Sequence, residues 1–203
     1  MVNNFEQIRE LLDFKSDDDF YFLQILQRKK DNKNGTKVNG SNNNSRLVKA
    51  YYVKSVEHFD FIVPEVIELC NIFNARAGFN LNKRSFRKMA LQHLKKVTDQ
   101  LINGSYDKAH KAYSSVVGAF SNDTDKKWVL DIDDVDDVSP LLLNFINNCE
   151  PKSKSLEDSK IIALIPSKSG FHVITKPFNV MEFKKVYQEI SIHKNNPTNL
   201  FIP

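Results

Sequence analysis

Two short stretches of the chain hold the residue types that could do chemistry. Residues 128–135 read Trp-Val-Leu-Asp-Ile-Asp-Asp-Val, which places Asp131 and Asp133 at the end of an apolar run. Residues 166–174 read Pro-Ser-Lys-Ser-Gly-Phe-His-Val-Ile, which places His172 just after a small, hydroxyl-rich turn. Carboxylates at positions i and i+2 of a strand point the same way, and they can share hard divalent cations such as Mg²⁺ or Mn²⁺. Together the two stretches predict a metal-dependent nucleotide site.

The turn before His172 carries groups that suit the oxygens of a phosphate. Ser167, Lys168 and Ser169 offer two hydroxyls and an ammonium, and the backbone of the turn offers N–H groups. We expect His172 to donate a hydrogen bond to a phosphate or sugar oxygen. The alternative is a histidine that is hydrogen-bonded within a sheet and takes no part in binding. The convergence of several polar groups favours the first interpretation.

Several common motifs are absent from the sequence. It has no P-loop, no Gly-x-Gly-x-x-Gly and no Gly-x-Ser-x-Gly elbow. A calcium loop starting at Asp131 is disfavoured, because its sixth position is Asp136 instead of Gly and its twelfth is Leu142 instead of Glu. The only cysteines are Cys70 and Cys149, so a zinc cluster of several cysteines is excluded. These absences disfavour the common ATPase, dehydrogenase and esterase classes.

The elements that must position the two stretches lie in the C-terminal third of the chain. Helices are predicted to start at Ser139-Pro140, as cap and first-turn proline, and at Asn179, with Glu182 completing a capping box. The second helix is expected to run through Ile190. Apolar patterns predict strands at residues 128–133, 160–165, 171–175 and 200–202. The order is β-α-β-β-α-β, that of an RRM-like or ferredoxin-like plait.

This plait makes a geometric prediction. Its first and third strands are central neighbours that run antiparallel, so the end of the first lies beside the start of the third. Asp131 and Asp133 end the first strand, and His172 begins the third. Alternation puts the two carboxylates on one face, while Leu130 and Ile132 pack against the helices. We therefore expect the three polar residues to converge on the open face of the sheet.

The chain as a whole is predicted to be α+β, with an N-terminal α/β subdomain at residues 1–126 and the plait at residues 127–203. Polar residues at 29–45, rich in Asn, predict a loop between two strands. Pro64 is expected to kink or restart a helix whose N-cap is Ser55. The predicted N-terminal helices span residues 5–14, 56–73 and 83–102, and the predicted strands span residues 20–26, 46–53 and 75–81.

Positive charge is concentrated around the helix predicted at residues 83–102. The strand before it is half buried and shows a polar face. We expect contacts to nucleic-acid phosphates from this region, by Arg76, Asn80, Lys83, Arg84, Arg87 and Lys88. The alternative is an ordinary solvated helix face.

Composition and hydropathy bound the class of protein. The 203 residues include 41% hydrophobic residues and 15 Phe, which is enough for a sizeable core. No apolar run approaches the ~20 residues of a membrane span, and the N-terminus lacks the regions of a signal peptide. We therefore expect a soluble, cytoplasmic protein without a membrane partner.

The two motifs resemble those of the archaeo-eukaryotic primase superfamily, the primase-polymerases. The hhhDhDh motif of that family is matched by Val129-Leu-Asp131-Ile-Asp133, and its S-x-H-type motif by Ser167-Lys-Ser169-Gly-Phe-His172. The resemblance covers residues 128–203. It implies a primase-like catalytic core, with an RRM-like plait, metal ions on Asp131 and Asp133, and contacts from His172 and a neighbouring serine to the incoming nucleotide.

The resemblance also implies an activity and partners. The implied activity is a DNA primase or polymerase reaction, in which nucleoside triphosphates start or extend a strand on a single-stranded DNA template with Mg²⁺ or Mn²⁺. The sequence contains no zinc module and no helicase domain. A priming role would then involve a helicase or another replication protein, or serve a small replicon such as that of a phage or plasmid.

The sequence departs from the family at its third motif, an acidic residue expected before or on the last strand. Residues 190–198 contain no Asp or Glu, and Glu189 belongs to the helix pattern. One alternative is therefore a non-catalytic module that binds single-stranded nucleic acid. A metal-dependent nuclease is a further alternative, although the chain lacks a characteristic Glu/Asp-x-Lys motif.

Overall fold

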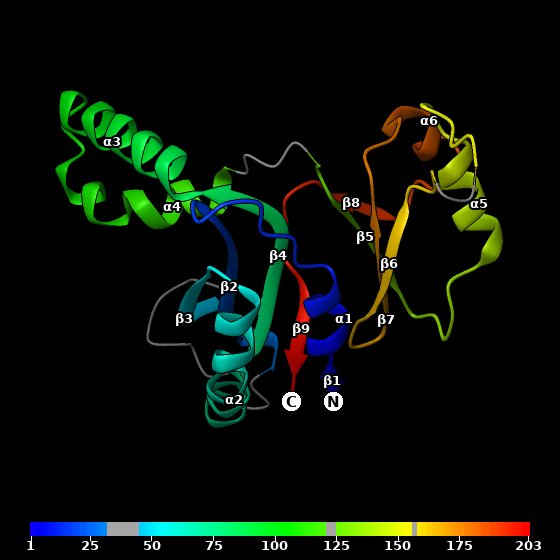
Figure 1. Cartoon of the computed structure of the whole chain (residues 1–203), viewed down its shortest axis with the longest axis horizontal. Helices are drawn as coiled ribbons and strands as arrows, with labels where there is room; N and C mark the ends of the chain where they lie inside the picture. The colour runs from blue at the N-terminus through cyan, green and yellow to red at the C-terminus, as the bar shows by residue number, and fades with distance from the viewer. Residues whose placement is uncertain (32–44, 121–124, 156–157) are drawn as a thin grey trace.

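The computed structural model of the chain describes residues 1–31, 45–120, 125–155 and 158–203. These residues form an α+β fold with six α-helices and two antiparallel sheets (Figure 1). We call the five-stranded sheet the large sheet and the four-stranded sheet the small sheet. Of the predicted Asn-rich loop, residues 32–44 lie outside the described part of the chain.

The large sheet has the spatial order β1-β9-β4-β2-β3. Its strands are β1 (Val2–Asn3), β2 (Asp19–Arg28), β3 (Ser45–Val53), β4 (Arg76–Ser85) and β9 (Thr198–Ile202). The three strands predicted in the N-terminal half are therefore confirmed. The predicted boundary after β4 was wrong, because β4 continues to Ser85 and the next helix begins at Phe86 and not at Lys83.

The helices of the N-terminal half are α1 (Phe5–Glu10), α2 (Val56–Phe73), α3 (Phe86–Ile102) and α4 (Ala112–Ala119). Helix α2 has the predicted bounds, and the hydroxyl of its N-cap Ser55 accepts a hydrogen bond from the His58 N–H at 3.1 Å. The restart expected as one outcome at Pro64 is wrong, since α2 runs through this residue as one helix. Helix α1 ends at Glu10, short of the predicted residue 14.

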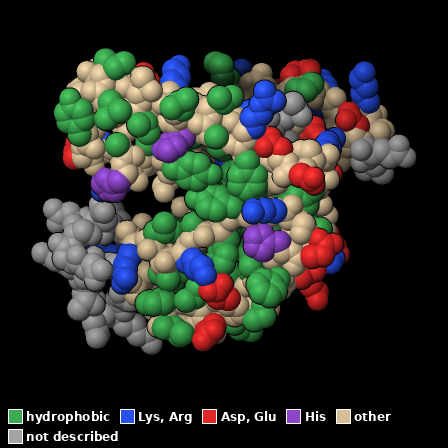
Figure 2. Space-filling model, turned by 60° about the vertical axis from the view of Figure 1, so that its left-hand side comes forward, with side chains coloured by type: hydrophobic (Ala, Val, Ile, Leu, Met, Phe, Trp, Pro, Cys, Tyr) green, Lys and Arg blue, Asp and Glu red, His purple; other side chains and the backbone are tan. Residues whose placement is uncertain are grey.

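Helices α3 and α4 form an arm that extends from the large sheet (Figure 1). Met89 is the only buried residue of α3 among those described. In Figure 2, hydrophobic side chains lie on the surface of this arm beside Lys and Arg. The exposed apolar residues of α3 are Leu91, Leu94, Leu101 and Ile102.

The small sheet has the order β6-β7-β5-β8. Its elements along the chain are β5 (Trp128–Asp133), α5 (Pro140–Asn148), β6 (Ile161–Pro166), β7 (Gly170–Thr175), α6 (Val180–Lys184) and β8 (Ser191–His193). The predicted antiparallel pairing of the first and third strands is confirmed, because β5 pairs with β7. Helix α6 ends at Lys184 and not at the predicted Ile190.

The last strand of the chain is not where the sequence placed it. The fourth strand of the small sheet is β8, whereas β9 pairs with β1 and β4 in the large sheet. Leu200, Phe201 and Ile202 are all buried. A strand that is apolar on both faces suits the interior of a covered sheet, whereas the short, partly exposed β8 suits an edge. The prediction that the last strand belongs to a plait at residues 127–203 is therefore wrong, because this strand is part of the large sheet.

Three hydrophobic cores are present among the described residues, and two of them involve the small sheet. The first lies between the sheets and α2, and contains Phe79 and Leu23 of the large sheet with Val129 and Ile174 of the small sheet. The second lies under α5 and α6 and contains Leu130. The predicted alternation of β5 is thus confirmed, since neighbouring residues enter different cores. No helix among the described residues is long and apolar enough to cross a membrane.

Candidate functional site

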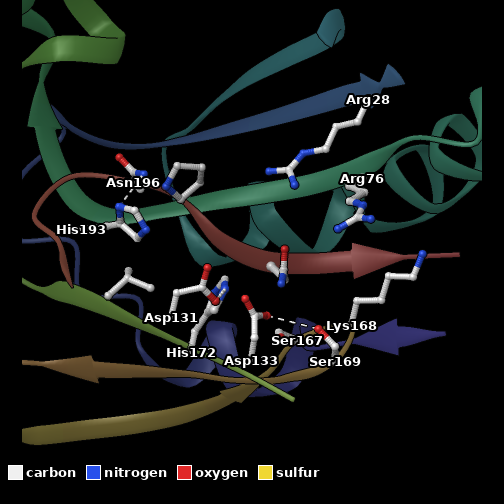
Figure 3. A pocket seen from close by; sticks show the side chains of 13 residues that line it. Arg28, Arg76, Asp131, Asp133, Ser167, Lys168, Ser169, His172, His193 and Asn196 are labelled. Carbon is white, nitrogen blue, oxygen red and sulfur yellow. Dashed lines mark hydrogen bonds and ion pairs between the residues drawn. The ribbon is translucent and has the colours of Figure 1, made fainter. Parts of the chain in front are cut away.

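A polar cavity of about 520 Å³ lies between the two sheets (Figure 3). The small sheet and its β6–β7 turn supply Val129, Asp131, Asp133, Ser167, Lys168, Ser169, His172 and His193. The large sheet and the segment before β9 supply Arg28, Arg76, Asn196, Pro197 and Asn199. The cavity brings together all six residues predicted for metal, catalysis and nucleotide, together with Arg76.

The pairing of β5 with β7 sets the positions of the predicted acids and histidine. Asp131 lies directly opposite His172, and Asp133 lies opposite Gly170. Cross-strand partners project from the same face of a sheet, so Asp131 and His172 both point into the cavity. Gly170 is required here, because a Cβ at this position would lie 2.1 Å from the carbonyl oxygen of Ile132. The absence of a side chain lets the turn close against the end of β5.

His172 makes two hydrogen bonds with its ring. Its Nε2 lies 3.2 Å from Oδ1 of Asp131, and its Nδ1 lies 2.8 Å from the hydroxyl of Thr198. A carboxylate only accepts, so the neutral ring donates from Nε2 and accepts at Nδ1 from Thr198. Burial lowers the pKa of His172 from its usual 6.5, and His193 lowers it further, while Asp131 and Asp133 oppose the shift. The lowered pKa favours the neutral form of the ring, and His172 as a whole is 9% exposed.

These contacts change the role expected of His172. Both ring nitrogens are engaged, so neither is left to donate to a phosphate or sugar oxygen in this arrangement. The expectation of an open sheet face is also wrong, because Thr198 of β9, in the large sheet, is hydrogen-bonded to the ring. The geometry makes His172 a residue that orients Asp131, whose side chain remains 34% exposed.

The β6–β7 turn holds the second carboxylate. The Ser169 hydroxyl donates to Oδ1 of Asp133 at 3.2 Å, and the Asp134 N–H donates to the Ser169 carbonyl at 2.7 Å. The hydroxyl oxygen of Ser167 is buried and has no hydrogen-bond partner among the described residues. An unpaired buried hydroxyl in a polar cavity is a group that a ligand could satisfy. The turn thus contains Ser169, which is hydrogen-bonded to Asp133, and Ser167, whose hydroxyl has no partner among the described residues. Lys168 lies between them.

Two arginines face the carboxylates from the large sheet (Figure 3). Arg76 is paired with Asp31, with 2.8 Å between Nε and Oδ2. Arg28 has no ion-pair partner within the part of the chain that the structure describes. Sequence reasoning missed Arg28, which stands two residues beyond the predicted strand 20–26. Because Leu26 pairs with Arg76, alternation along β2 puts Arg28 on the face of Arg76.

The segment where the primase resemblance would place a third acid contains β8. His193 pairs with Val129, so it shares the cavity face with Asp131, and its Nδ1 lies 3.1 Å from the Asn196 amide nitrogen. Among the described residues, no three His, Cys, Asp or Glu side chains converge closely enough to hold a metal ion. The described residues therefore supply two carboxylates, those of Asp131 and Asp133, as candidate metal ligands in the cavity.

The structure exposes some of the residues predicted to contact nucleic acid and buries others. Arg87 and Lys88 are exposed on α3. Asn80 is buried and donates to the Asn195 carbonyl at 2.6 Å. Two basic residues of β4 are also withdrawn from the surface. Lys83 is 8% exposed and Arg84 is 1% exposed, with Nε of Arg84 donating to the Val117 carbonyl at 2.7 Å. In this conformation these three side chains are not available to a phosphate.

Comparison of the chain with protein-family models, with curated proteins and with solved structures found no match. The assignment of function therefore rests on the geometry of the cavity.

Proposed function

We propose that this protein is a nucleotidyltransferase of the primase-polymerase type. It would use nucleoside triphosphates with Mg²⁺ or Mn²⁺ to start or extend a strand on a single-stranded DNA template. The observation that carries the proposal is the distribution of charge across the cavity, where Asp131 and Asp133 face Arg28 beside the Arg76–Asp31 ion pair (Figure 3). A metal-bound triphosphate presents both signs of charge and matches these two walls.

The two carboxylates fit a hard divalent cation when a nucleotide is present. Their Oδ1 atoms are used by His172 and Ser169, and their Oδ2 atoms have no protein partner among the residues described. Mg²⁺ is commonly held by one or two carboxylates together with substrate phosphates and water. Asp131 and Asp133 would hold the ion, which would supply neutralisation of the triphosphate charge.

The other residues of the cavity position the nucleotide. Arg28 and Lys168 provide positive charge for phosphate oxygens, and the unsatisfied Ser167 hydroxyl provides a hydrogen-bond donor. His172 fixes the carboxylate of Asp131 in one orientation. Correct orientation of the reacting groups contributes a large part of the rate in phosphoryl and nucleotidyl transfer.

We also propose that the small sheet with α5 and α6 is an RRM-like plait and the core of a primase-like fold. In its favour, the chain order of these elements is β-α-β-β-α-β, and the first strand, β5, lies between the third and fourth strands. The plait then ends at β8, and the large sheet corresponds to the N-terminal subdomain with β9 added to it.

Incorporation of labelled nucleotides on primed and unprimed DNA templates tests the proposal. We expect incorporation with Mg²⁺ or Mn²⁺, and its loss in the double variant Asp131→Asn/Asp133→Asn. The variant Asp136→Asn removes one carboxylate from the following loop and should retain activity. Failure of the wild type with both metals, or an active double variant, would refute the proposal.

A second candidate is a module that binds single-stranded nucleic acid without catalysis. The observation that favours it is the lack of a third metal-binding side chain in the described structure. It predicts salt-dependent binding of single-stranded DNA without incorporation. The same assay separates the two candidates, and cleavage of the template would point to a nuclease.

A further inference from the structure

A second groove lies away from the cavity that holds the carboxylates. It has a volume of about 460 Å³ and is lined by Ala119, Phe120, Lys126, Trp128, Pro177, Lys194 and Asn195. A neighbouring groove of about 380 Å³ shares Lys126 and Pro177 with it and adds Lys127 and Lys176, together with Asp125 and Ile162. Among the described residues, no carboxylate lines the first groove.

The first groove combines aromatic rings with positive charge. Phe120 is 43% exposed and presents its ring to the groove. The Nζ of Lys194 lies 5.0 Å from the centroid of the Trp128 ring. Phe178 meets the same ring edge-on at 5.5 Å and holds it from the side of the core. The indole is therefore fixed by packing, and the ammonium group of Lys194 lies over its face.

Rings and lysines side by side match the chemistry of a single nucleic-acid strand. Unpaired bases stack on aromatic side chains, and lysines neutralise the phosphates that link those bases. A double helix keeps its bases stacked on one another and offers no base face to Phe120 or Trp128. A free phosphate or an acidic peptide would use the lysines but would leave the rings unused. The groove thus favours a single strand over these ligands.

Side-chain amides of the buried Asn82 and of Asn195 connect the segments that line this groove. The side chain of Asn82 donates to the Lys127 carbonyl at 2.9 Å and to the Lys194 carbonyl at 3.3 Å, and it accepts from the Lys127 N–H at 2.7 Å. Asn195 in turn donates to the Gly118 carbonyl at 3.3 Å, next to Phe120. The groove is therefore a preformed part of the fold.

The groove lies on the same strands as the candidate site. Trp128 begins β5, which carries Asp131 three residues later, and Lys194 directly follows His193 of the cavity. With a rise of about 3.3 Å per residue, Trp128 is about 10 Å along β5 from Asp131. The three-residue spacing puts the Trp128 ring on the opposite face of β5 from Asp131, so the groove is a site separate from the cavity.

We propose that the groove lined by Phe120, Lys126, Trp128 and Lys194 binds single-stranded nucleic acid, with bases on the rings and phosphates on the lysines. The inference rests on the proposed function in one respect, that the bound strand would be the template. The binding itself does not depend on catalysis.

The intrinsic fluorescence of the protein reports on this groove directly, because Trp128 is the only tryptophan of the chain. The wild type is titrated with oligodeoxythymidine of about 15 nucleotides, long enough for an extended groove. We expect saturable quenching of Trp128 that weakens as salt is raised. Oligouridine in a parallel titration distinguishes RNA from DNA as the strand. Absence of binding at low salt, or saturable binding without any change in Trp128 fluorescence, would overturn the proposal.

Variants with a matched control sharpen the test. Phe120→Ala should weaken binding by about 5-fold to 150-fold, the cost of one lost stacking contact. Lys194→Gln should reduce the dependence of log affinity on log salt by about 0.7, as for one lost phosphate contact on a single strand. Lys108→Gln removes the same charge from an exposed site in the 3₁₀ helix Tyr106–Lys111 and should change neither value. Equal effects of Lys194→Gln and Lys108→Gln would overturn the proposal.

The two proposals fail in different ways. Binding of a nucleoside triphosphate with Mg²⁺, measured by calorimetry, should be unchanged in Phe120→Ala and Lys194→Gln. Binding of the oligonucleotide should persist in Asp131→Asn/Asp133→Asn. Loss of triphosphate binding in the groove variants would show that they disturb the cavity, and would count against a separate site. Quenching by the oligonucleotide without any incorporation would leave the groove in place and refute only the catalytic proposal.

Discussion

The ring of His172 holds the carboxylate of Asp131 from the neighbouring strand, with 3.2 Å between Nε2 and Oδ1. The contact is possible because β5 and β7 pair these two residues directly. Thr198 completes the arrangement from the large sheet, at 2.8 Å from the other ring nitrogen. A residue of one sheet thereby fixes the orientation of an acid on the other.

The hydrogen bond from Thr198 should contribute measurably to stability. Thr198→Val leaves Nδ1 of the buried ring without a donor, which we expect to lower the free energy of unfolding by about 1–3 kcal/mol. Urea denaturation measures this change. Thr98→Val is the control, because the Thr98 hydroxyl is exposed on α3 and should matter by less than about 0.5 kcal/mol. Equal effects of the two substitutions would contradict the assigned hydrogen bond.

His172 should also make stability depend on pH. Its pKa in the folded protein is lowered from 6.5, chiefly by burial. Above about pH 6.5 the ring is neutral in both states, but below it the unfolded chain gains a proton that the folded chain resists. Stability should therefore fall as the pH drops from about 7 to 5. Urea denaturation in a buffer with a chelator measures this, and His172→Gln should show a smaller fall. Identical pH profiles would contradict the lowered pKa.

Gly170 should be required for closure of the β6–β7 turn. In Gly170→Ala the new Cβ meets the Ile132 carbonyl oxygen at 2.1 Å, so the backbone must shift. We expect a loss of about 3 kcal/mol or more in the free energy of unfolding, together with weaker triphosphate binding. Gly118→Ala is the control, since a Cβ there would meet no described atom within 4 Å outside the adjoining helix backbone, and alanine favours helix α4 by about 0.5–1 kcal/mol. A well-tolerated Gly170→Ala would show that the turn is not tightly packed.

Arg28 should contribute to binding of the triphosphate. Arg28→Gln removes a guanidinium from the cavity wall opposite the carboxylates. A charged hydrogen bond of about 1.5–3 kcal/mol corresponds to roughly 10-fold to 150-fold weaker binding. Calorimetry with a nucleoside triphosphate and Mg²⁺ measures it. Arg87→Gln, at an exposed position on α3, should leave the affinity unchanged. Unchanged affinity in Arg28→Gln would remove this arginine from the proposed site.

Local sequence pattern was sufficient for the positions of the two acids and the histidine on their strands. The alternation of polar and apolar residues along residues 128–133 depends only on the period of a strand, and Leu130 and Ile132 enter the core that it predicts. The element order of the C-terminal third then predicted the pairing of β5 with β7. The closeness of Asp131 and His172 followed from these two local properties.

Other features depended on contacts between segments far apart in the chain. Pattern alone could not show which sheet β9 would join, because its apolar residues fit the interior of either one. That choice placed Thr198 within hydrogen-bonding distance of His172 and turned a predicted phosphate ligand into a residue that orients a carboxylate. Arg28 and Arg84 are both basic residues at strand positions, yet one lines the cavity and the other is 1% exposed. The sequence by itself determined which residues share a face of a strand. The tertiary structure decided what covers that face, because burial and hydrogen bonding depend on the packing of the two sheets against each other.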